Sequence, residues 1–405
     1  MNYVTVQPLI EKVINLSSFE HNLLQIKKYL KNTKILAVVK ADAYGHGMED
    51  IALTCMKNGV DFFGVATAIE AIKLRQFLNK QQIGNNVNSA DKTSVNNISP
   101  KILCWIYDIA EKDIQVLAEN NIDISISNLQ QIDALKKASE NLNTTMAGKN
   151  IQIRVHIKID TGMGRAGVSW QNLQEVIDKI KIIEKVKIVG LFSHLACADE
   201  IDNDYTNEQI NKFEKAIKIC NKNNLKIEYK HLGASSGILF HPNSHYDMVR
   251  AGIIMYGLSP NPSRITSEEL HIKPVMTVQA KIVQIKKMCA GSKISYGGTY
   301  TLKKDSYIAI IPIGYADGIP RIISNNWKVE IKGKLYKQIG RICMDQFMVD
   351  LGENLDCVKV SDIAVVLGEK NSADEMAEVA QTINYEILVN MINNNRMATK
   401  YVYDN

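Results

Sequence analysis

A lysine stands at the end of the first strongly apolar segment of the chain. Residues 35–39 read Ile-Leu-Ala-Val-Val, and Lys40 follows them directly, ahead of Tyr44 and the segment Gly45-His46-Gly47. A charged lysine is costly to bury, so one interpretation is a side chain that extends from the strand end to solvent. The other is an amine whose pKa is lowered by partial burial, which can act as a nucleophile or a base.

Four more polar segments follow apolar segments in the same way. They contain Lys158 and Arg165, His194, the small residues 233–237 (Gly-Ala-Ser-Ser-Gly), and Arg250. Each has an ordinary structural explanation. The glycines beside Arg165 fit a turn as well as an anion contact, a single histidine is more often structural than catalytic, and residues 233–237 fit a helix N-cap as well as a phosphate site.

Taken together, these residues are more informative than any one of them alone. A lysine, a histidine, two arginines and a Ser/Gly segment that all follow apolar strands suggest a phosphate-bearing cofactor or substrate beside a lysine. Enzymes that use pyridoxal 5'-phosphate (PLP) need a Schiff-base lysine, a phosphate site and a partner for the pyridine nitrogen. The residues by themselves therefore predict an enzyme, with PLP as a candidate cofactor and no particular reaction.

Alternating strands and helices must position these residues. Near-continuous apolar segments separated by helix-period segments are typical of a parallel sheet that is buried on both faces. Eight such segments predict a (β/α)8 TIM-type barrel, in which reactive groups gather at the carboxyl ends of the strands; an open doubly wound sheet is the alternative. The eight segments are 35–40, 61–67, 101–107, 122–127, 151–160, 186–195, 225–233 and 248–257.

The pattern changes after about residue 270. Segments rich in Val and Ile and separated by glycine turns, such as VMTVQAKIVQI and YIAIIPIG, predict a second, mainly β domain. We expect the α/β barrel to occupy residues 11–270 and the β domain residues 271–405, with residues 1–10 packed against the latter. The polar, Asn/Ser-rich segment 79–100 is expected to be a solvated surface insertion.

Composition narrows the class of protein. The chain has 405 residues, 46% of them hydrophobic and 22% charged, which is ordinary for a globular protein. The net charge of +5 is scattered, which argues against a dedicated nucleic-acid binder. Seven cysteines without a CxxC pair argue for reduced thiols and against structural zinc. With no apolar segment as long as a membrane span, and with Glu11 and Lys12 near the N-terminus, we expect no membrane insertion and a cytoplasmic location.

Seven sequence blocks resemble the signature blocks of bacterial alanine racemase, and they occur in that family's order from about residue 11 to the end of the chain. The blocks are AVVKADAYGHG (37–47), KIDTGMGRAGV (158–168), FSHLACADE (192–200), MVRAGIIMYGL (248–258), ISYGGTYT (294–301), IGYADGIPR (313–321) and GRICMDQ (340–346). The resemblance implies a fold-type III enzyme: a PLP-binding barrel, a β domain and a head-to-tail homodimer with shared active sites.

The resemblance also implies the catalytic residues. Lys40 would hold PLP as a Schiff base and then act as the base for D-alanine, and Tyr296 of the other subunit would be the base for L-alanine. The phosphate would be held by Tyr44, Ser236, Gly252, Ile253 and Tyr401. Met344 and Asp345 would line the substrate site, and Asp199, Tyr315, Arg321 and Arg341 resemble the residues at its entrance.

The cations of the barrel also receive roles. Arg165 would contact the phenolic oxygen of PLP and the substrate, and Lys158 matches a lysine that is carbamylated in many members. Arg250 would face the pyridine nitrogen. Because an arginine cannot accept a proton, the ring would stay unprotonated and act as a weaker electron sink, which would suppress transamination. His194 would couple Arg250 to Tyr296 and depress the pKa of the tyrosine.

The implied function is alanine racemisation, which supplies D-alanine for peptidoglycan. A broad-specificity or serine racemase of the same fold is the alternative. A decarboxylase of this fold is disfavoured because its glycine-rich HxGSG-type block is missing, and a PLP-binding homeostasis protein resembles the barrel alone. Two positions depart from the family pattern: Ala398-Thr399 replaces a Pro-Arg pair, and Ser235 replaces an asparagine.

Overall fold

The computed structural model describes residues 7–88, 99–142, 151–391 and 396–404. The chain divides into two compact units, which are described separately. The barrel unit contains Leu23–Ala43 and Gly47–Met255, and the β unit contains Met1–Asn22, Tyr44–His46 and Tyr256–Asn405.

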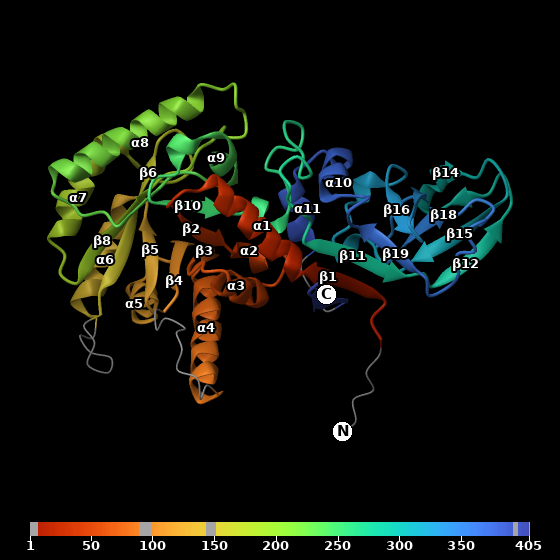
Figure 1. Cartoon of the computed structure of the whole chain (residues 1–405), viewed down its shortest axis with the longest axis horizontal. Helices are drawn as coiled ribbons and strands as arrows, with labels where there is room; N and C mark the ends of the chain where they lie inside the picture. The colour runs from red at the N-terminus through yellow and green to blue at the C-terminus, as the bar shows by residue number, and fades with distance from the viewer. Residues whose placement is uncertain (1–6, 89–98, 143–150, 392–395, 405) are drawn as a thin grey trace. The chain divides into compact units, whose positions relative to one another are not determined.

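The barrel unit has a sheet of parallel strands among its helices (Figure 1), and the pairing of the strands closes this sheet into a ring. Its order is β5-β4-β3-β2-β10-β9-β8-β6, and pairing of β5 with β6 closes the ring. These are the eight apolar segments that predicted a (β/α)8 barrel, so that prediction is confirmed and the open sheet is wrong. The strands are β2 (Lys34–Val38), β3 (Phe62–Thr67), β4 (Lys101–Ile106), β5 (Ile122–Ile126), β6 (Ile153–Asp160), β8 (Val186–Phe192), β9 (Tyr229–His231) and β10 (Met248–Ala251), with the short β7 (Val168–Ser169) beside β6.

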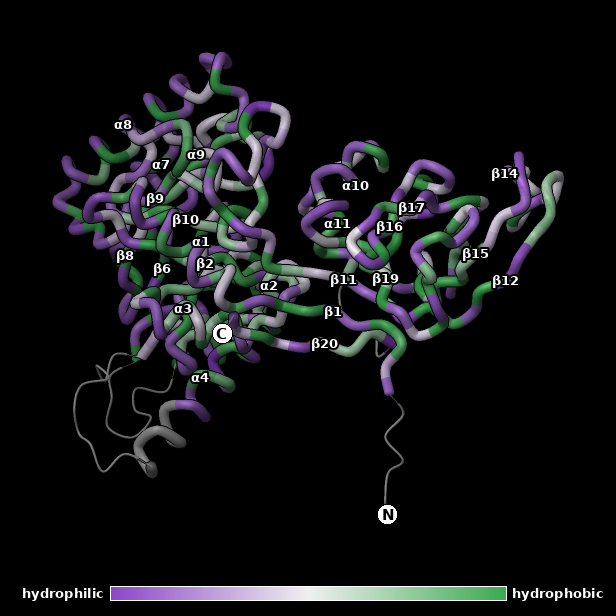
Figure 2. Tube along the Cα trace, turned by 45° about the vertical axis from the view of Figure 1, so that its right-hand side comes forward, coloured by the Kyte–Doolittle hydropathy of each residue, from purple (hydrophilic) through white to green (hydrophobic). Residues whose placement is uncertain are grey.

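Helices surround these strands because their sequences carry one apolar face. In α7 (Leu173–Lys181) the buried residues are Leu173, Val176, Ile177 and Ile180, which recur at helical spacing. Hydrophilic and hydrophobic positions interleave in the same way along α8 (Tyr205–Lys222; Figure 2). The other helices are α1 (Leu16–Tyr29), which crosses from the β unit into the barrel unit, α3 (Met48–Lys57), α4 (Ala68–Asn88), α5 (Glu111–Glu119), α6 (Leu129–Glu140) and α9 (Ser235–Phe240).

Helix α4 continues into the polar segment 79–100. The helix ends at Asn88, so the first ten residues of the segment are helical, whereas residues 89–98 lie outside the described residues. Within the described ranges, every helix is too short or too polar to cross a lipid bilayer.

The β unit is built on a nine-stranded sheet in the order β12-β15-β18-β17-β16-β19-β11-β1-β20. The N-terminal strand β1 pairs in parallel with β20 near the chain end and antiparallel with β11. Burial alternates along β1 and β11, as expected for strands with one face on a core. The bounds are β1 (Ile10–Asn15), β11 (Met276–Lys281), β12 (Gln284–Met288), β15 (Ser306–Ile311), β16 (Lys328–Ile331), β17 (Lys334–Ile339), β18 (Phe347–Asp350), β19 (Ile363–Leu367) and β20 (Met397–Val402), with hairpin β13 (Lys293–Ile294) and β14 (Tyr300–Thr301) and helices α10 (Ala373–Ala380) and α11 (Asn384–Asn390).

Candidate active site

Lys40 begins a left-handed turn directly after β2. Ala41, Asp42, Ala43 and Tyr44 have φ angles of 50°, 53°, 54° and 54°. This conformation costs an L-residue roughly 1–2 kcal/mol per position, so other contacts must hold it. In the barrel unit the Asp42 carboxylate accepts from the Met48 N–H (2.9 Å), and Glu70 accepts from the Ala41 N–H (2.7 Å).

Glu70 connects this turn to the end of the neighbouring strand. Its second carboxylate oxygen accepts from the backbone N–H groups of Ala66 (2.9 Å) and Thr67 (2.8 Å), at the carboxyl end of β3. The backbone that carries Lys40 is therefore held to β3 by one carboxylate. Sequence reasoning missed Glu70, because nothing in its local pattern distinguishes it from an ordinary first-turn helix residue.

The amine of Lys40 is half-buried, and its Nζ lies 6.0 Å from the centre of the Trp105 ring. Burial and the charge of Arg165 lower the pKa of Lys40, while the charge of Glu70 opposes that shift. A lowered pKa makes a larger share of the amine available as a nucleophile or base.

His194 lies among four cations of the barrel unit. Burial, followed by the charges of Arg250, Arg165, Lys158 and Lys40, lowers the pKa of His194 to about 3. The imidazole is therefore neutral at pH 7. The structure thus brings together the five charged or titratable residues that the sequence assigned to the carboxyl ends of the strands.

Arg250 is almost completely buried and makes a dense set of hydrogen bonds. Its Nη2 donates to the carbonyls of Ser193 (2.7 Å) and Leu232 (2.8 Å) and lies 3.3 Å from His194 Nδ1. Its Nη1 donates to the His231 carbonyl (3.0 Å). Burial lowers the pKa of Arg250 to about 9, which still leaves the guanidinium protonated at neutral pH. The orientation of this donor group is fixed.

Lys158 and Arg165 follow one another along β6 and the loop after it. The Nζ of Lys158 lies 5.7 Å from the centre of the Phe192 ring. Burial, then the charges of Arg165 and Arg250, lowers the pKa of Lys158 to about 8. Arg165 itself is exposed. A third positive charge that interacts with Arg165 and Arg250 is unfavourable, unless the lysine is neutral or chemically modified.

Hydroxyl and amide donors lie at two short helical segments of the barrel unit. Ser236 is half-buried in the first turn of α9, where helix N–H groups point toward an incoming anion. Ser235 is buried, and its hydroxyl accepts from the Gly252 N–H (3.2 Å). A phosphate at Gly252 would have to share or replace that bond. Ile253 begins the next 3₁₀ turn and is buried.

The β unit contains the remaining residues assigned to the phosphate. Tyr44 is buried, with its ring 4.9 Å from that of Tyr256 and 6.1 Å from that of Tyr385. Burial raises the pKa of Tyr44, so the phenol keeps its proton. Tyr401 lies on β20, paired in register with Ile14 of β1.

Tyr296 lies in an exposed turn of the β unit, and 68% of the residue is accessible to solvent. The preceding Ser295 has φ +61°, and its hydroxyl donates to the Arg341 carbonyl (2.7 Å). Gly297 has φ +72°, a left-handed backbone conformation that favours a glycine. The turn therefore leaves Tyr296 exposed on the surface of the β unit.

Asp345 is held by a partner that sequence reasoning missed. Its carboxylate pairs with Arg396 (2.8 Å), and Arg396 also contacts the buried Asp317 (3.2 Å). Met344 is exposed beside Asp345. Of the residues assigned to the entrance, Tyr315, Arg321 and Arg341 are exposed in the β unit and Asp199 is half-buried in the barrel unit.

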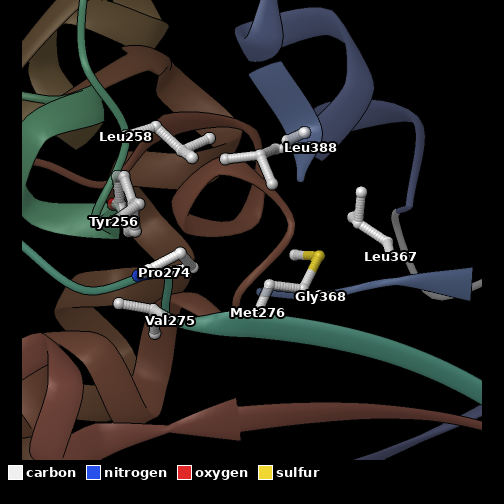
Figure 3. A pocket seen from close by; sticks show the side chains of 9 residues that line it. Tyr256, Leu258, Pro274, Val275, Met276, Leu367, Gly368 and Leu388 are labelled. Atoms are coloured by element: carbon white, nitrogen blue, oxygen red, sulfur yellow. The ribbon is translucent and has the colours of Figure 1, made fainter. Parts of the chain in front are cut away.

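A small apolar hollow lies in the β unit, and Tyr256, whose ring packs on that of Tyr44, is part of its lining (Figure 3). The lining carries no charged side chain. The lining residues are Tyr256, Leu258, Pro274, Val275, Met276, Leu367, Gly368, Ala373 and Leu388.

Lys40, Arg250 and Ser236 of the barrel unit have side chains whose chemistry fits PLP. An amine with a lowered pKa suits a carbonyl carbon, a fixed guanidinium suits a ring nitrogen that accepts, and the Ser236 hydroxyl at a helix start suits a phosphate.

Comparison with known proteins agrees with this chemistry. Residues 14–260 match the family model "Alanine racemase, N-terminal domain", and residues 275–401 match "Alanine racemase, C-terminal domain". The chain is 37% identical over 381 residues to alanine racemase 1 of Clostridium acetobutylicum, covering 93% of this chain and 91% of that one. It is 36% identical over 381 residues to the alanine racemase of Corynebacterium glutamicum, covering 94% of this chain and 96% of that one.

Solved structures show the same architecture. The alanine racemase of Streptomyces lavendulae superimposes with a TM-score of 0.86 at 30% identity, with 98% of each chain covered. The alanine racemase of Clostridium difficile superimposes with a TM-score of 0.85 at 35% identity, with 99% of this chain and 97% of that chain covered. The two family models together span most of the chain, and the relatives exceed 30% identity over nearly all of it. The chain therefore belongs to the alanine racemase family.

Proposed function

We propose that this protein interconverts L-alanine and D-alanine with PLP as its cofactor. The observation that carries the proposal is the placement of Arg250 beside His194, with 3.3 Å between Nη2 and Nδ1, where the charges of Arg165 and Lys40 also help to lower the pKa of the imidazole. PLP, when bound, withdraws electrons from the α-carbon of the amino acid and so makes its α-proton removable. The residues of the chain must bind that group and move the proton.

Lys40 and Tyr296 are the two bases in this proposal. The lowered pKa of Lys40 supports its use as both the attachment point and the base for D-alanine. Tyr296 serves L-alanine; its exposure on the β unit supports a role at the barrel of a second subunit, in a homodimer with shared sites. Met344 and Asp345, on the same unit, would line the substrate site.

The remaining residues bind and orient. By the family resemblance, Ser236, Gly252 and Ile253, together with Tyr44 and Tyr401, would hold the phosphate. Arg250 would donate to the pyridine nitrogen, and because it keeps its proton, that nitrogen would stay unprotonated. Arg165 would contact the phenolic oxygen, and His194 would transmit the charge of Arg250 toward Tyr296 of the second subunit.

A panel of L-amino acids tests the proposed reaction. Purified, PLP-loaded protein is incubated with each amino acid, and the D-product is measured by chiral chromatography. D-alanine should be the main product. Faster formation of D-serine would favour a serine racemase of the same fold, and no D-product from any amino acid would contradict the proposal.

Lys158 should carry a carbamate. Only the neutral amine reacts with carbon dioxide, and with a pKa of about 8 its neutral fraction grows as the pH rises through that value. The added carboxylate would attract Arg165 instead of repelling it. We expect a carbamate carbon signal from protein equilibrated with ¹³C-bicarbonate, stronger at pH 9 than at pH 7.

The Lys158→Ala variant should lose this signal and at least about tenfold of its activity, with partial rescue by small carboxylates. Lys187→Ala is the matched control, because Lys187 lies on the neighbouring β8 but pairs with Glu228 (2.6 Å). Full activity of Lys158→Ala without additives would exclude the role.

A further inference from the structure

A continuous series of polar side chains passes through the interior of the barrel. Arg250 Nη1 lies 3.1 Å from His231 Nδ1, His231 Nε2 lies 3.0 Å from His156 Nδ1, and His156 Nε2 lies 3.2 Å from Asp123 Oδ2. The exposed fractions are 5% for Arg250, 0% for both histidines and 2% for Asp123. Four strands contribute one residue each: β10, β9, β6 and β5.

The two ends of the series determine where every proton lies. An arginine can only donate, so His231 Nδ1 must be unprotonated. Neutral His231 then carries its proton on Nε2 and donates to His156 Nδ1. His156 in turn carries its proton on Nε2 and donates to the Asp123 carboxylate. Because the series is buried, a second proton on either ring would force two N–H donors, or an N–H donor and the guanidinium, against each other.

Neighbouring rings hold both imidazoles in place. Phe192 stacks on His231 with ring centres 4.7 Å apart and planes 1° apart. Tyr229 lies parallel to His156 at 6.0 Å, with an interplanar angle of 8°. Rotating either imidazole would require these aromatic contacts to open. Burial and the charge of Arg250 also keep the pKa of His231 well below its ordinary value, so the ring is neutral.

Asp123 is itself anchored as a carboxylate. Arg154 donates to it through Nε (2.8 Å) and Nη2 (3.4 Å). Burial alone would raise the pKa of Asp123, but the hydrogen bond from His156 and the charge and hydrogen bond of Arg154 outweigh burial and hold the pKa below its ordinary value. A fixed negative charge therefore stands at the far end of the series from Arg250.

We propose that Asp123 is a positioning residue which, through His156 and His231, fixes both tautomers and holds Arg250 as a hydrogen-bond donor. Arg250 then presents in one orientation the N–H that these bonds leave over, the one on Nε. The effect of this arrangement on catalysis rests on the proposed function, in which Arg250 donates to the pyridine nitrogen. The tautomers themselves do not depend on any activity.

Two substitutions of Asp123 distinguish the effect of losing its hydrogen-bond acceptor from the effect of losing its negative charge. Asp123→Leu removes the acceptor, so His156 Nε2–H is left buried without a partner, at a cost of roughly 1–3 kcal/mol. We expect the Nδ1–H tautomer of His156 to appear, which breaks the bond to His231. Asp123→Asn keeps a carbonyl oxygen in place and should retain both tautomers. Asp247→Asn is the matched control, because Asp247 pairs with Lys230 (2.7 Å) next to β10 but lies outside the series.

The measurement is magic-angle-spinning NMR of the holoenzyme with ¹⁵N-labelled histidine. The chain has eight histidines, and spectra of His156→Gln and His231→Asn assign the two signals. In the wild type both rings should be protonated on Nε2 and bare on Nδ1. Asp123→Leu should alter the pattern, whereas Asp123→Asn and Asp247→Asn should not.

A kinetic comparison accompanies the spectra. Asp123→Leu should lower kcat by about tenfold with little change in KM for alanine, since Arg250 acts on the cofactor rather than on alanine; Asp123→Asn should restore most of kcat. A wild-type signal for Nδ1–H on either ring overturns the inference, even if Asp123→Leu does not fold. Unchanged tautomers in a folded Asp123→Leu protein also overturn it. Expected tautomers in a protein without racemase activity would support the inference and contradict the proposed function instead.

Discussion

The Lys40→Ala protein should bind PLP without a covalent bond and lose at least about 10³-fold of its racemase activity. Two functions disappear together, because the same amine attaches the cofactor and returns the proton to one face of the substrate. The lowered pKa of Lys40 makes it the amine suited to both tasks. The measurement is borohydride reduction of the wild type followed by peptide mapping, with kinetics of the variant in parallel.

Lys34→Ala provides the matched control. Lys34 begins the same strand β2, and its amine lies 5.5 Å from the centre of the Tyr229 ring. This variant should keep the covalent cofactor and most of its activity. Cofactor fixed by reduction on any lysine other than Lys40 would refute the site assignment.

Replacing Tyr296 with phenylalanine should separate the two directions of proton exchange. Racemisation needs both bases, and because the enantiomers have equal free energy, kcat/KM must fall equally in both directions, by about 10²–10⁴-fold. Exchange of the α-proton with heavy water is not bound by that symmetry. Lys40 should still exchange the proton of D-alanine, while exchange from L-alanine falls sharply. Proton NMR of each enantiomer in heavy water measures both rates.

Tyr300→Phe is the control for this substitution. Tyr300 lies on β14, four residues after Tyr296, and has no assigned role at the site. It should leave both exchange rates near those of the wild type. Equal loss of exchange from both enantiomers in Tyr296→Phe would argue for a single base and against the proposed pair.

The barrel could be predicted from sequence because most of its strands are largely apolar. In β2 every residue after Lys34 is buried, so the strand lacks the alternation of a sheet with one buried face, and helices with one apolar face separate the strands. Parallel strands also end at one edge, which explains why Lys40, His194 and Arg250 could be grouped by their positions in the sequence alone. The sequence resemblance then supplied the roles that spacing alone left open.

The contacts that hold these residues could not be predicted in the same way. Asp123, His156 and His231 lie on three different strands, and each looks like an isolated polar residue in its own segment. The pairing of Arg396 with Asp345 joins residues far apart in sequence.

The backbone conformation after Lys40 and the length of α4 could not be predicted from the sequence either. Four consecutive left-handed residues after Lys40 contain no glycine, so composition gives no sign of the turn. Helix α4 extends to Asn88 through a polar stretch that lacks an apolar face, and periodicity cannot detect such a helix.

Circular dichroism of alanine solutions tests the central claim most directly. Two samples, one of pure L-alanine and one of pure D-alanine, are incubated with the same PLP-loaded protein. Both signals should decay to zero, because the equilibrium mixture of enantiomers is equal, and the total alanine should remain constant. A stable nonzero signal, or loss of alanine to a keto acid, would contradict racemisation by this site.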